Sequence, residues 1–277
     1  MRRFALIGRG VSQSLSPIIY NWFFREKGYE ARYTVIEPSE GLDGIAELLK
    51  RLDGFNVTIP YKKDILRYLD EVRGPAAEIG AVNTVKNEEG VLVGYNTDYR
   101  GFLKALSIAG APGYDTVLMI GAGGAARAAL YALRGLARRV YIVSRSGVSA
   151  RELARLALSW GFRGSLGLRQ GDPLVKEATS GSDLIVNASP VGSDGASTPI
   201  DPALLREPCT VIDMVYRPLE TPLLKASRRA GCRTVDGLWM LAGQASENLW
   251  IWLGARASPE KLREAALRGL KHGVGSR

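Results

Sequence analysis

Residues 56–63 read NVTIPYKK, so two lysines, Lys62 and Lys63, follow a short β-branched run and a proline. A lysine at this position is either a solvated charge on the first turn of a helix or a base at the mouth of a cleft. The one histidine of the chain, His272, lies in a Gly-rich tail, where we expect it to be solvated. Ser-His-Asp and Cys-His chemistry are therefore excluded, and acid–base catalysis has to use Lys, Asp, Glu, Tyr or Cys side chains.

Small hydroxyl and amide side chains are concentrated in four segments that follow or interrupt strand-like runs. These segments read SQSLSP (12–17), NVTIPYK (56–62), AVNT (81–84) and GYNTD (94–98). Loops at the C-terminal ends of parallel strands are where α/β proteins bind ligands. Together the segments offer Ser, Thr and Asn groups with one lysine, Lys62, and one aspartate, Asp98, which suits a small polyhydroxylated molecule. Taken alone, Asp98 could simply cap the helix that follows it.

A dinucleotide-binding pattern begins at residue 116, where the chain reads TVLMIGAGGAARAAL. Gly121, Gly123 and Ala126 fit G-x-G-x-x-G/A, in which the glycines permit a tight turn and the close approach of a pyrophosphate to a helix N-terminus. A bare glycine motif is weak. Here it lies between an apolar strand and a small-residue helix, and a second strand follows at the right distance. We therefore favour a dinucleotide site over an ordinary Gly-rich turn.

The end of that second strand predicts which dinucleotide is bound. NAD-selective sites place an Asp or Glu about 20 residues after the glycines, where it binds the ribose 2′-hydroxyl. Here the strand RVYIVSRS ends in Ser144, Arg145 and Ser146. An arginine fork between hydroxyls suits a 2′-phosphate, so the sequence favours NADP. Arg127 could assist, Arg151 is a weaker candidate, and the alternative is that Arg145 is a solvated strand-end charge.

The composition indicates a globular protein that handles an anion. The 277 residues are 46% hydrophobic and carry a formal net charge of +9, and the length predicts one large domain or two ordinary ones. No apolar stretch approaches the roughly 20 residues that cross a bilayer, and FALI is too short for a signal peptide, so we expect a cytoplasmic protein that binds no membrane. The basic residues are scattered over helices, which favours an anionic substrate or cofactor over nucleic acid.

The two cysteines, Cys209 and Cys232, belong to no CxxC motif and have no histidine nearby in the sequence. A metal site is therefore not expected.

Apolar strand-like runs alternate with helical patterns along most of the chain, which predicts an α/β fold. In chain order we predict a strand at 3–8, a helix at 17–28, a strand at 32–37, a helix at 44–52 and a strand at 54–59. A helix after Pro60, a hairpin over 81–98 and a connecting helix at 99–110 follow. A Pro- and Gly-containing boundary at 111–115 precedes a second α/β series, which ends in helices at 238–253 and 258–271. Trp239, Trp250 and Trp252 are expected to be packing residues.

Six motifs in collinear order resemble the shikimate dehydrogenase family. They are Ser-x-Ser-Pro from Ser14, Asn-Val-Thr-x-Pro-x-Lys at 56–62, Ala-Val-Asn-Thr at 81–84, Gly-x-Asn-Thr-Asp-x-x-Gly at 94–101, Gly-Ala-Gly-Gly-Ala at 121–125 and Gly-x-x-Met-Leu-x-x-Gln at 237–244. The resemblance covers nearly the whole chain. It implies two domains with the site in the cleft between them: a substrate domain of residues 1–100 and 238–277, and a Rossmann domain of residues 101–237 that binds NADP (NADPH).

The resemblance also implies roles for individual residues. Lys62 and Asp98 resemble the catalytic pair of the family. The shikimate-binding set would be Ser14 and Ser16, which grip the carboxylate, with Thr58, Asn83, Asp98, Tyr216 and Gln244. The cofactor-binding set would be Gly121, Ala122, Gly123, Gly124, Ala125, Ser144, Arg145, Ser146, Val215, Gly237 and Met240. The implied reaction is reversible hydride transfer between NADPH and the 3-keto group of 3-dehydroshikimate, and the implied place is aromatic amino-acid biosynthesis. A homodimer is left open.

The sequence departs from the family pattern at three places. Asn-Arg-Thr at the second Rossmann strand becomes Ser144-Arg145-Ser146, Pro190 and Ser193 alter the loop after residue 187, and Gln13 replaces a histidine. The arginine is kept, so NADP remains favoured, while a quinate/shikimate dehydrogenase with relaxed NAD/NADP use is an alternative. A shikimate-binding sensor without turnover is another, although the presence of both Lys62 and Asp98 argues against it.

Overall fold

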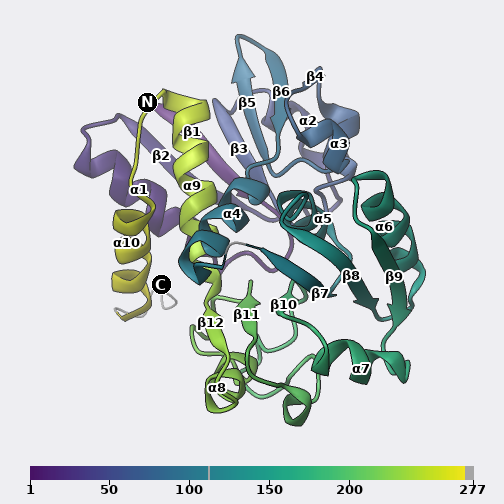
Figure 1. The fold of residues 1–277 in the computed structure, drawn as a ribbon. Helices are drawn as coiled ribbons and strands as arrows, with labels where there is room; N and C mark the ends of the chain where they lie inside the picture. Colours follow the sequence, from purple (N-terminus) through teal and green to yellow (C-terminus); the bar gives the residue numbers. More distant parts are fainter. Residues whose placement is uncertain (112, 272–277) are drawn as a thin grey trace. The chain divides into compact units, whose positions relative to one another are not determined.

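The computed structural model describes residues 1–111 and 113–271, so the predicted solvation of His272 concerns a residue outside this part of the chain. The chain divides into two compact units, one formed by residues 1–101 with the chain from 241 onward and the other by residues 102–240. Each unit contains one six-stranded sheet, and the α/β fold class is confirmed (Figure 1). No helix within the described residues is both long enough and apolar enough to cross a membrane.

The first sheet is mixed, with the strand order β2-β1-β3-β5-β6-β4. Its strands are β1 (Arg2–Ile7), β2 (Ala31–Ile36), β3 (Gly54–Val57), β4 (Glu71–Val72), β5 (Thr84–Glu88) and β6 (Val91–Tyr95). β1 runs parallel to β2 and β3, whereas β5 runs antiparallel to both β3 and β6. The ends of β1, β3 and β6 and the start of β5 therefore meet at one edge of the sheet, where the polar segments of the sequence are placed.

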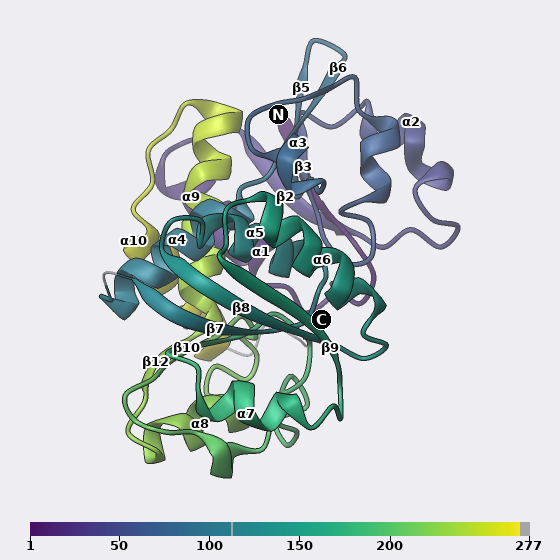
Figure 2. The ribbon, with the colours of Figure 1, turned by 45° about the vertical axis from the view of Figure 1, so that its right-hand side comes forward.

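One face of this sheet is covered by α1 (Ser16–Glu26), α9 (Gly237–Leu253) and α10 (Pro259–Lys271) (Figures 1 and 2). Successive β1 side chains point to opposite faces. Phe4 packs against Phe24 of α1 and Trp252 of α9. A Cβ at Gly54 would lie 2.5 Å from Trp252 Nε1, so the glycine makes room for this indole. Trp252 is the packing residue that we predicted, whereas Trp250 is 49% exposed.

The other face packs on short helical segments, which are a 3₁₀ turn (Asp43–Ile45), α2 (Ala46–Leu49), a 3₁₀ helix (Asp64–Tyr68) and α3 (Ala76–Ile79). Ala5 and Ile7 share a core there with Leu49 and Ile65. The helix predicted at 44–52 is shorter than expected. The helix predicted after Pro60 is present only as the 3₁₀ helix Asp64–Tyr68. Residues 61–63 form turns instead, and the Lys62 carbonyl accepts from Val82 N at 2.8 Å.

The second sheet is parallel throughout, with the order β12-β11-β10-β7-β8-β9. Its strands are β7 (Tyr114–Ile120), β8 (Ala137–Ser144), β9 (Gly164–Arg169), β10 (Leu184–Asn187), β11 (Thr210–Asp213) and β12 (Arg233–Val235). This is the doubly wound Rossmann order, in which the chain first adds strands on one side of β7 and then on the other. The switch point, where such folds bind ligands, lies between β7 and β10.

Helices cover both faces of the second sheet. They are α4 (Asp98–Ala109), α5 (Gly124–Ala132), α6 (Val148–Ser159), α7 (Leu174–Ser180) and α8 (Pro222–Arg229), with a 3₁₀ turn at Pro202–Leu204. α5 and α6 lie on one face, and α7 and α8 on the other (Figures 1 and 2). α8 begins where Thr221 Oγ1 accepts from Leu224 N and Pro222 takes the first helical position. A disulfide joins Cys209, before β11, to Cys232, before β12.

Candidate active site

Lys62 and Asp98 form an ion pair within the first unit. Lys62 Nζ donates to Asp98 Oδ2, and the two side chains are only 14% and 8% exposed. Lys62 lies in the turns that follow β3, and Asp98 is the first residue of α4, where the helix dipole favours a negative charge. The fold thus joins two residues that are 36 positions apart in the sequence. Lys62 is therefore not a solvated charge on the first turn of a helix, which is the alternative interpretation of the sequence. Its neighbour Lys63 is exposed.

Asn83 connects the ion pair to the β5–β6 hairpin. Its Nδ2 donates to Asp98 Oδ1 at 2.9 Å, and its Oδ1 accepts from Thr97 N at 2.6 Å. The two carboxylate oxygens of Asp98 are therefore divided between Lys62 and Asn83. An ammonium has three donors, so Lys62 can bind Asp98 and still donate to a ligand.

Gln244 reaches the same network from α9. Its Oε1 lies 3.4 Å from Asn83 Nδ2 and 3.0 Å from the Nδ2 of Asn248, one helical turn further on. Asn83 and Gln244 are 2% and 7% exposed. Four of the predicted catalytic and substrate-binding residues, Lys62, Asp98, Asn83 and Gln244, are thus linked by hydrogen bonds.

Ser14 and Ser16 lie between β1 and the first turn of α1. Ser16 N donates to Ser14 Oγ at 3.2 Å, and Ser16 is buried. Thr58 directly follows β3. A Cβ placed on Gly8 would lie 2.4 Å from Thr58 Cγ2, so Thr58 packs against the segment that leads to the serines.

A carboxylate that we did not predict holds this serine-bearing loop. Glu37, just after β2, accepts from the backbone N–H groups of Gly10, Val11 and Ser12 at 3.0, 3.0 and 2.9 Å. Arg9 Nε donates to Tyr61 Oη at 3.1 Å, which ties the loop to the residue before Lys62. The loop is therefore fixed by polar contacts at its base.

The glycine turn of the second unit lies between β7 and α5, at the switch point. Gly121 has a φ of +104°, and a Cβ there would lie 2.8 Å from Ala188 O after β10, so only glycine suits this position. A Cβ on Gly123 would meet nothing within 4 Å. Backbone N–H groups at the start of α5 have no intrahelical partner. The turn is therefore open to an anion, and its geometry fits a pyrophosphate.

Ser144, Arg145 and Ser146 form the turn between β8 and α6. Ser144 Oγ accepts from Gly147 N at 3.1 Å and from Ala150 N at 3.3 Å, which fixes the start of α6. Arg145 is exposed and has no hydrogen bond or ion pair to any other described residue. Its guanidinium is therefore available for a phosphate.

The other predicted residues of the second unit lie around the end of β11. Val215 N donates to Asp213 Oδ1 at 3.0 Å, and burial raises the pKa of this aspartate. A Cβ on Gly237 would lie 2.4 Å from Met214 O, so the start of α9 packs closely on that backbone. Met240 is buried in the same unit. Tyr216 also lies in the second unit, whereas the other predicted substrate-binding residues lie in the first.

Two buried members of the polar network, Tyr20 and Asn248, lie outside every predicted polar segment. Asn56, Thr84 and Thr97 belong to those segments but receive no role of their own from the sequence. Asn248 had a usable signal, because it lies four positions after Gln244 on a helix and must therefore share its face. The contributions of Tyr20 and Asn56 depend on contacts between segments that the sequence alone does not pair.

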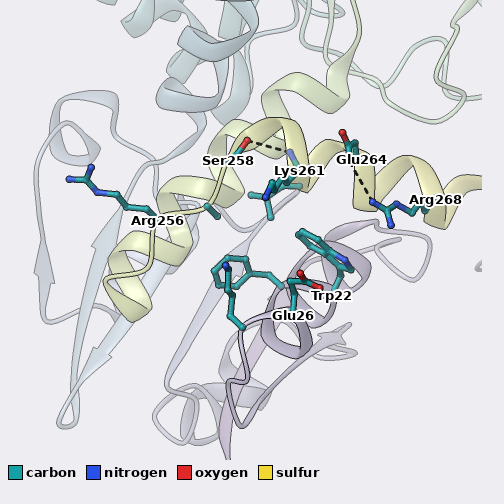
Figure 3. A pocket seen from close by; sticks show the side chains of 11 residues that line it. Trp22, Glu26, Arg256, Ser258, Lys261, Glu264 and Arg268 are labelled. Atoms are coloured by element: carbon teal, nitrogen blue, oxygen red, sulfur yellow. Dashed lines mark hydrogen bonds and ion pairs between the residues drawn. The ribbon is translucent and has the colours of Figure 1, made fainter.

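A cavity of about 350 Å³ lies elsewhere in the first unit and contains none of the predicted site residues. Trp22 and Glu26 of α1 face Lys261, Glu264 and Arg268 of α10 across it (Figure 3). Its charged side chains are exposed and of both signs, so it lacks the buried, mutually oriented polar groups that surround Lys62. The residues that the structure describes include no group of three or more His, Cys, Asp or Glu side chains that could hold a metal ion.

A family model described as the shikimate dehydrogenase substrate binding domain matches residues 6–85. This segment contains Ser14, Ser16, Thr58, Lys62 and Asn83. A shikimate dehydrogenase (NADP(+)) of Aeropyrum pernix is 46% identical over 99% of this chain and 100% of its own.

Two solved structures extend the comparison. Shikimate 5-dehydrogenase of Thermus thermophilus, in complex with NADP(H) and shikimate, is 36% identical with a TM-score of 0.85, covering 97% of this chain and 99% of its own. Quinate dehydrogenase of Corynebacterium glutamicum, in complex with NAD, is 30% identical with a TM-score of 0.87, covering 96% and 99%.

Proposed function

Since the chain belongs to the shikimate dehydrogenase family, we propose that it catalyses the reversible, NADP-dependent reduction of 3-dehydroshikimate to shikimate. It is thus an oxidoreductase that uses NADP and serves aromatic biosynthesis. The observation that carries the proposal is the buried Lys62–Asp98 pair, which lies inside a network of amides and hydroxyls suited to a polyhydroxylated ring.

The substrate contacts follow from the chemistry of the side chains. Shikimate carries one carboxylate and ring hydroxyls. Ser14 and Ser16 supply neutral donors for the carboxylate, and Tyr216 is proposed as a further substrate-binding residue. Thr58, Asn83 and Gln244 supply donors and acceptors for the hydroxyls.

Lys62 handles the proton in this mechanism. When a keto group is reduced, its oxygen becomes an alkoxide and needs a proton, and Lys62 Nζ is the donor; in the oxidation direction it accepts that proton. While charged, the ammonium also stabilises the developing alkoxide. Asp98 holds the lysine by one carboxylate oxygen and is itself oriented by Asn83, so the donor meets the substrate in a defined position.

NADP would be held by the second unit, and when bound it supplies the hydride. Gly121, Ala122, Gly123, Gly124 and Ala125 would hold the pyrophosphate, and Arg145 with Ser144 and Ser146 would bind the 2′-phosphate. Val215, Gly237 and Met240 would line the nicotinamide. The support for these roles is the open turn at Gly123 and the unengaged guanidinium of Arg145 within the described residues.

The domain assignment is part of the proposal. We propose a substrate domain of residues 1–100 and 238–277 and a cofactor domain of residues 101–237, which lie close to the limits of the two compact units. We also propose a cytoplasmic location, binding of a small molecule rather than nucleic acid or membrane, and a homodimer as the assembly to test by light scattering.

A quinate-oxidising, NAD-using enzyme is the second candidate. The likeness to the NAD complex of quinate dehydrogenase supports it, as does the serine at position 146 in place of the family's threonine. Absorbance of the reduced nicotinamide, followed with shikimate or quinate and with NADP or NAD, separates the candidates. We expect the highest kcat/KM for shikimate with NADP. Faster turnover of quinate with NAD would favour the second candidate, and no reduction of any cofactor would contradict both.

A further inference from the structure

Asn248 is the hub of the buried polar network, although none of the sequence motifs includes it. The side chain is fully buried on α9. Its Oδ1 lies 2.7 Å from both Thr84 Oγ1 and Thr97 Oγ1, and its Nδ2 lies 2.6 Å from Tyr20 Oη and 3.0 Å from Gln244 Oε1.

The directions of the Asn83, Gln244 and Asn248 amides can be worked out from two contacts of Asn83 whose direction is fixed. Thr97 N can only donate, so the Asn83 atom that it meets is Oδ1. Asp98 Oδ1 is an acceptor, so the Asn83 atom that it meets is Nδ2. The orientation of Asn83 is therefore determined without reference to the other amides.

The remaining amides follow in order. Because Asn83 presents Nδ2 to Gln244, the atom of Gln244 that faces it is Oε1. That oxygen needs a donor from Asn248, which is Nδ2. The other end of the Asn248 amide is Oδ1, and it accepts the protons of both threonine hydroxyls. With its proton committed, Thr97 Oγ1 is the acceptor for Asn83 Nδ2 at 3.0 Å.

Asn248 thus constrains one residue of the proposed substrate site directly, because its Nδ2 donates to Gln244 Oε1. Asn83 is already fixed by Thr97 N and Asp98. Because Oε1 of Gln244 is turned toward Asn83 and Asn248, Nε2 is the end of the amide that donates. One of its two protons goes to the Tyr20 hydroxyl, and the other can meet a substrate hydroxyl. A rotated amide would present an acceptor instead and would leave Asn248 Nδ2 facing another donor.

We propose that Asn248 is a positioning residue for substrate recognition, which holds Gln244 so that its Nε2 donates a hydrogen bond to a ring hydroxyl of shikimate. This inference rests on the proposed function. It adds a residue that does not touch the substrate and acts through Gln244, and it states which end of the Gln244 amide faces the ligand.

The test combines Asn248→Ala with Gln244→Ala in a double-mutant cycle. Shikimate affinity is measured by calorimetry, and kcat and KM by absorbance. We expect Asn248→Ala to weaken shikimate binding about tenfold, the equivalent of one neutral hydrogen bond, with the KM for NADP unchanged. In the background of Gln244→Ala, the same change should cost less than about threefold, because the residue through which Asn248 acts is already absent.

Two further variants separate positioning from general stability. Asn248→Ser keeps a small polar group that cannot reach both the threonine hydroxyls and Gln244 Oε1. Like Asn248→Ala, it should weaken shikimate binding. Thr84→Val removes one hydroxyl from Asn248 Oδ1 and leaves the Gln244 contact in place. It should lower the melting temperature but leave shikimate affinity within about twofold.

The possible results distinguish a failure of the Asn248 positioning role from a failure of the proposed function. A loss of affinity that is the same with and without Gln244, or an Asn248→Ala variant that binds shikimate as tightly as the wild type, would overturn the positioning role alone. A wild-type protein that binds no shikimate would overturn the proposed function and this inference together.

Discussion

At the scale of single residues, the hydrogen bonds around Lys62 and Asp98 each have an identified donor and acceptor. Asp98 binds Lys62 through one oxygen and Asn83 through the other, and a backbone N–H fixes the Asn83 amide. Tyr20 closes the network, and burial raises the pKa of its hydroxyl well above the usual range. Tyr20 therefore contributes as a neutral hydroxyl at any working pH. Preorganised donors of this kind lose little energy to reorientation during a reaction.

Arg145 is the residue that we propose decides the choice between the two nicotinamide cofactors. Its removal would take away a bidentate partner of the 2′-phosphate, which NADP has and NAD lacks. We expect Arg145→Ala to raise the KM for NADP by roughly 10–100-fold, the equivalent of a charge-assisted bond of about 1.5–3 kcal/mol, while the KM for NAD changes little. Steady-state kinetics with both cofactors measure this. Arg163→Ala, an exposed arginine before the start of β9, is the control, and an unchanged preference in Arg145→Ala would show that the phosphate is bound elsewhere.

At the scale of elements, strand ends and the loops after them do the positioning. The parallel ends of β1 and β3 and the start of antiparallel β5 meet at one edge, and Glu37 holds the loop that follows β1. Glu37 uses its carboxylate to accept three backbone N–H groups beside the proposed carboxylate-binding serines. The backbone of the loop is therefore held close to the serines that we propose bind the substrate carboxylate.

Replacing Glu37 by glutamine should loosen this loop. One oxygen becomes an NH₂ group, which faces a backbone N–H and cannot accept from it. We expect Glu37→Gln to raise the KM for shikimate about fivefold, through the two serines, with kcat reduced less than twofold because Lys62 and Asp98 are untouched. Glu40→Gln, at an exposed position, is the matched control. A fall in kcat with no change in KM would place the effect of Glu37 in the chemical step instead.

Much of this element-level arrangement can be predicted from the sequence, because strong patterns are local. The glycine turn, the strand before it and the small-residue helix after it are contiguous, and they fold as the motif predicts. β9 and α7 are missed, since β9 (GSLGLR) is a Gly-containing edge strand with Leu166 43% exposed. The turn at Lys62 is missed because a single long-range bond to Val82 decides it. The Asn248 network is likewise mostly long-range, because three of the four partners, Thr97, Thr84 and Tyr20, are 151 to 228 positions away.

At the scale of the whole molecule, the chain separates its chemistry into two units. One holds Lys62, Asp98 and the amides that we propose bind the substrate hydroxyls, and the other has the Rossmann strand order and the glycine turn. The family resemblance implies this division, including the return of the final helices to the first unit, and the two compact units have nearly the same limits. The contribution of the two cysteines to the second unit is not predictable from spacing alone.

The Cys209–Cys232 disulfide should stabilise the second unit. It closes a loop with a sequence separation of 23 residues that includes β11 and α8, and loops of this size lose chain entropy worth about 3 kcal/mol in the unfolded state. We expect Cys209→Ser with Cys232→Ser to lower the melting temperature by roughly 6–12 °C, on the scale of 2–4 °C per kcal/mol. Scanning calorimetry measures the shift. A reductant should lower the melting temperature of the wild type but not that of the double variant, and equal responses would contradict the assignment.

The central claim is that Lys62, held by Asp98, transfers the proton when shikimate is oxidised or formed. The most direct measurement is the kcat of Lys62→Ala together with its shikimate dissociation constant, with Lys63→Ala as the adjacent, exposed control. We expect a fall in kcat of roughly 10²–10⁴-fold, the usual contribution of a positioned acid–base group, with shikimate affinity within a few-fold of wild type and the control unchanged. Retained turnover with a collapse of shikimate affinity would contradict it and would make Lys62 a binding residue.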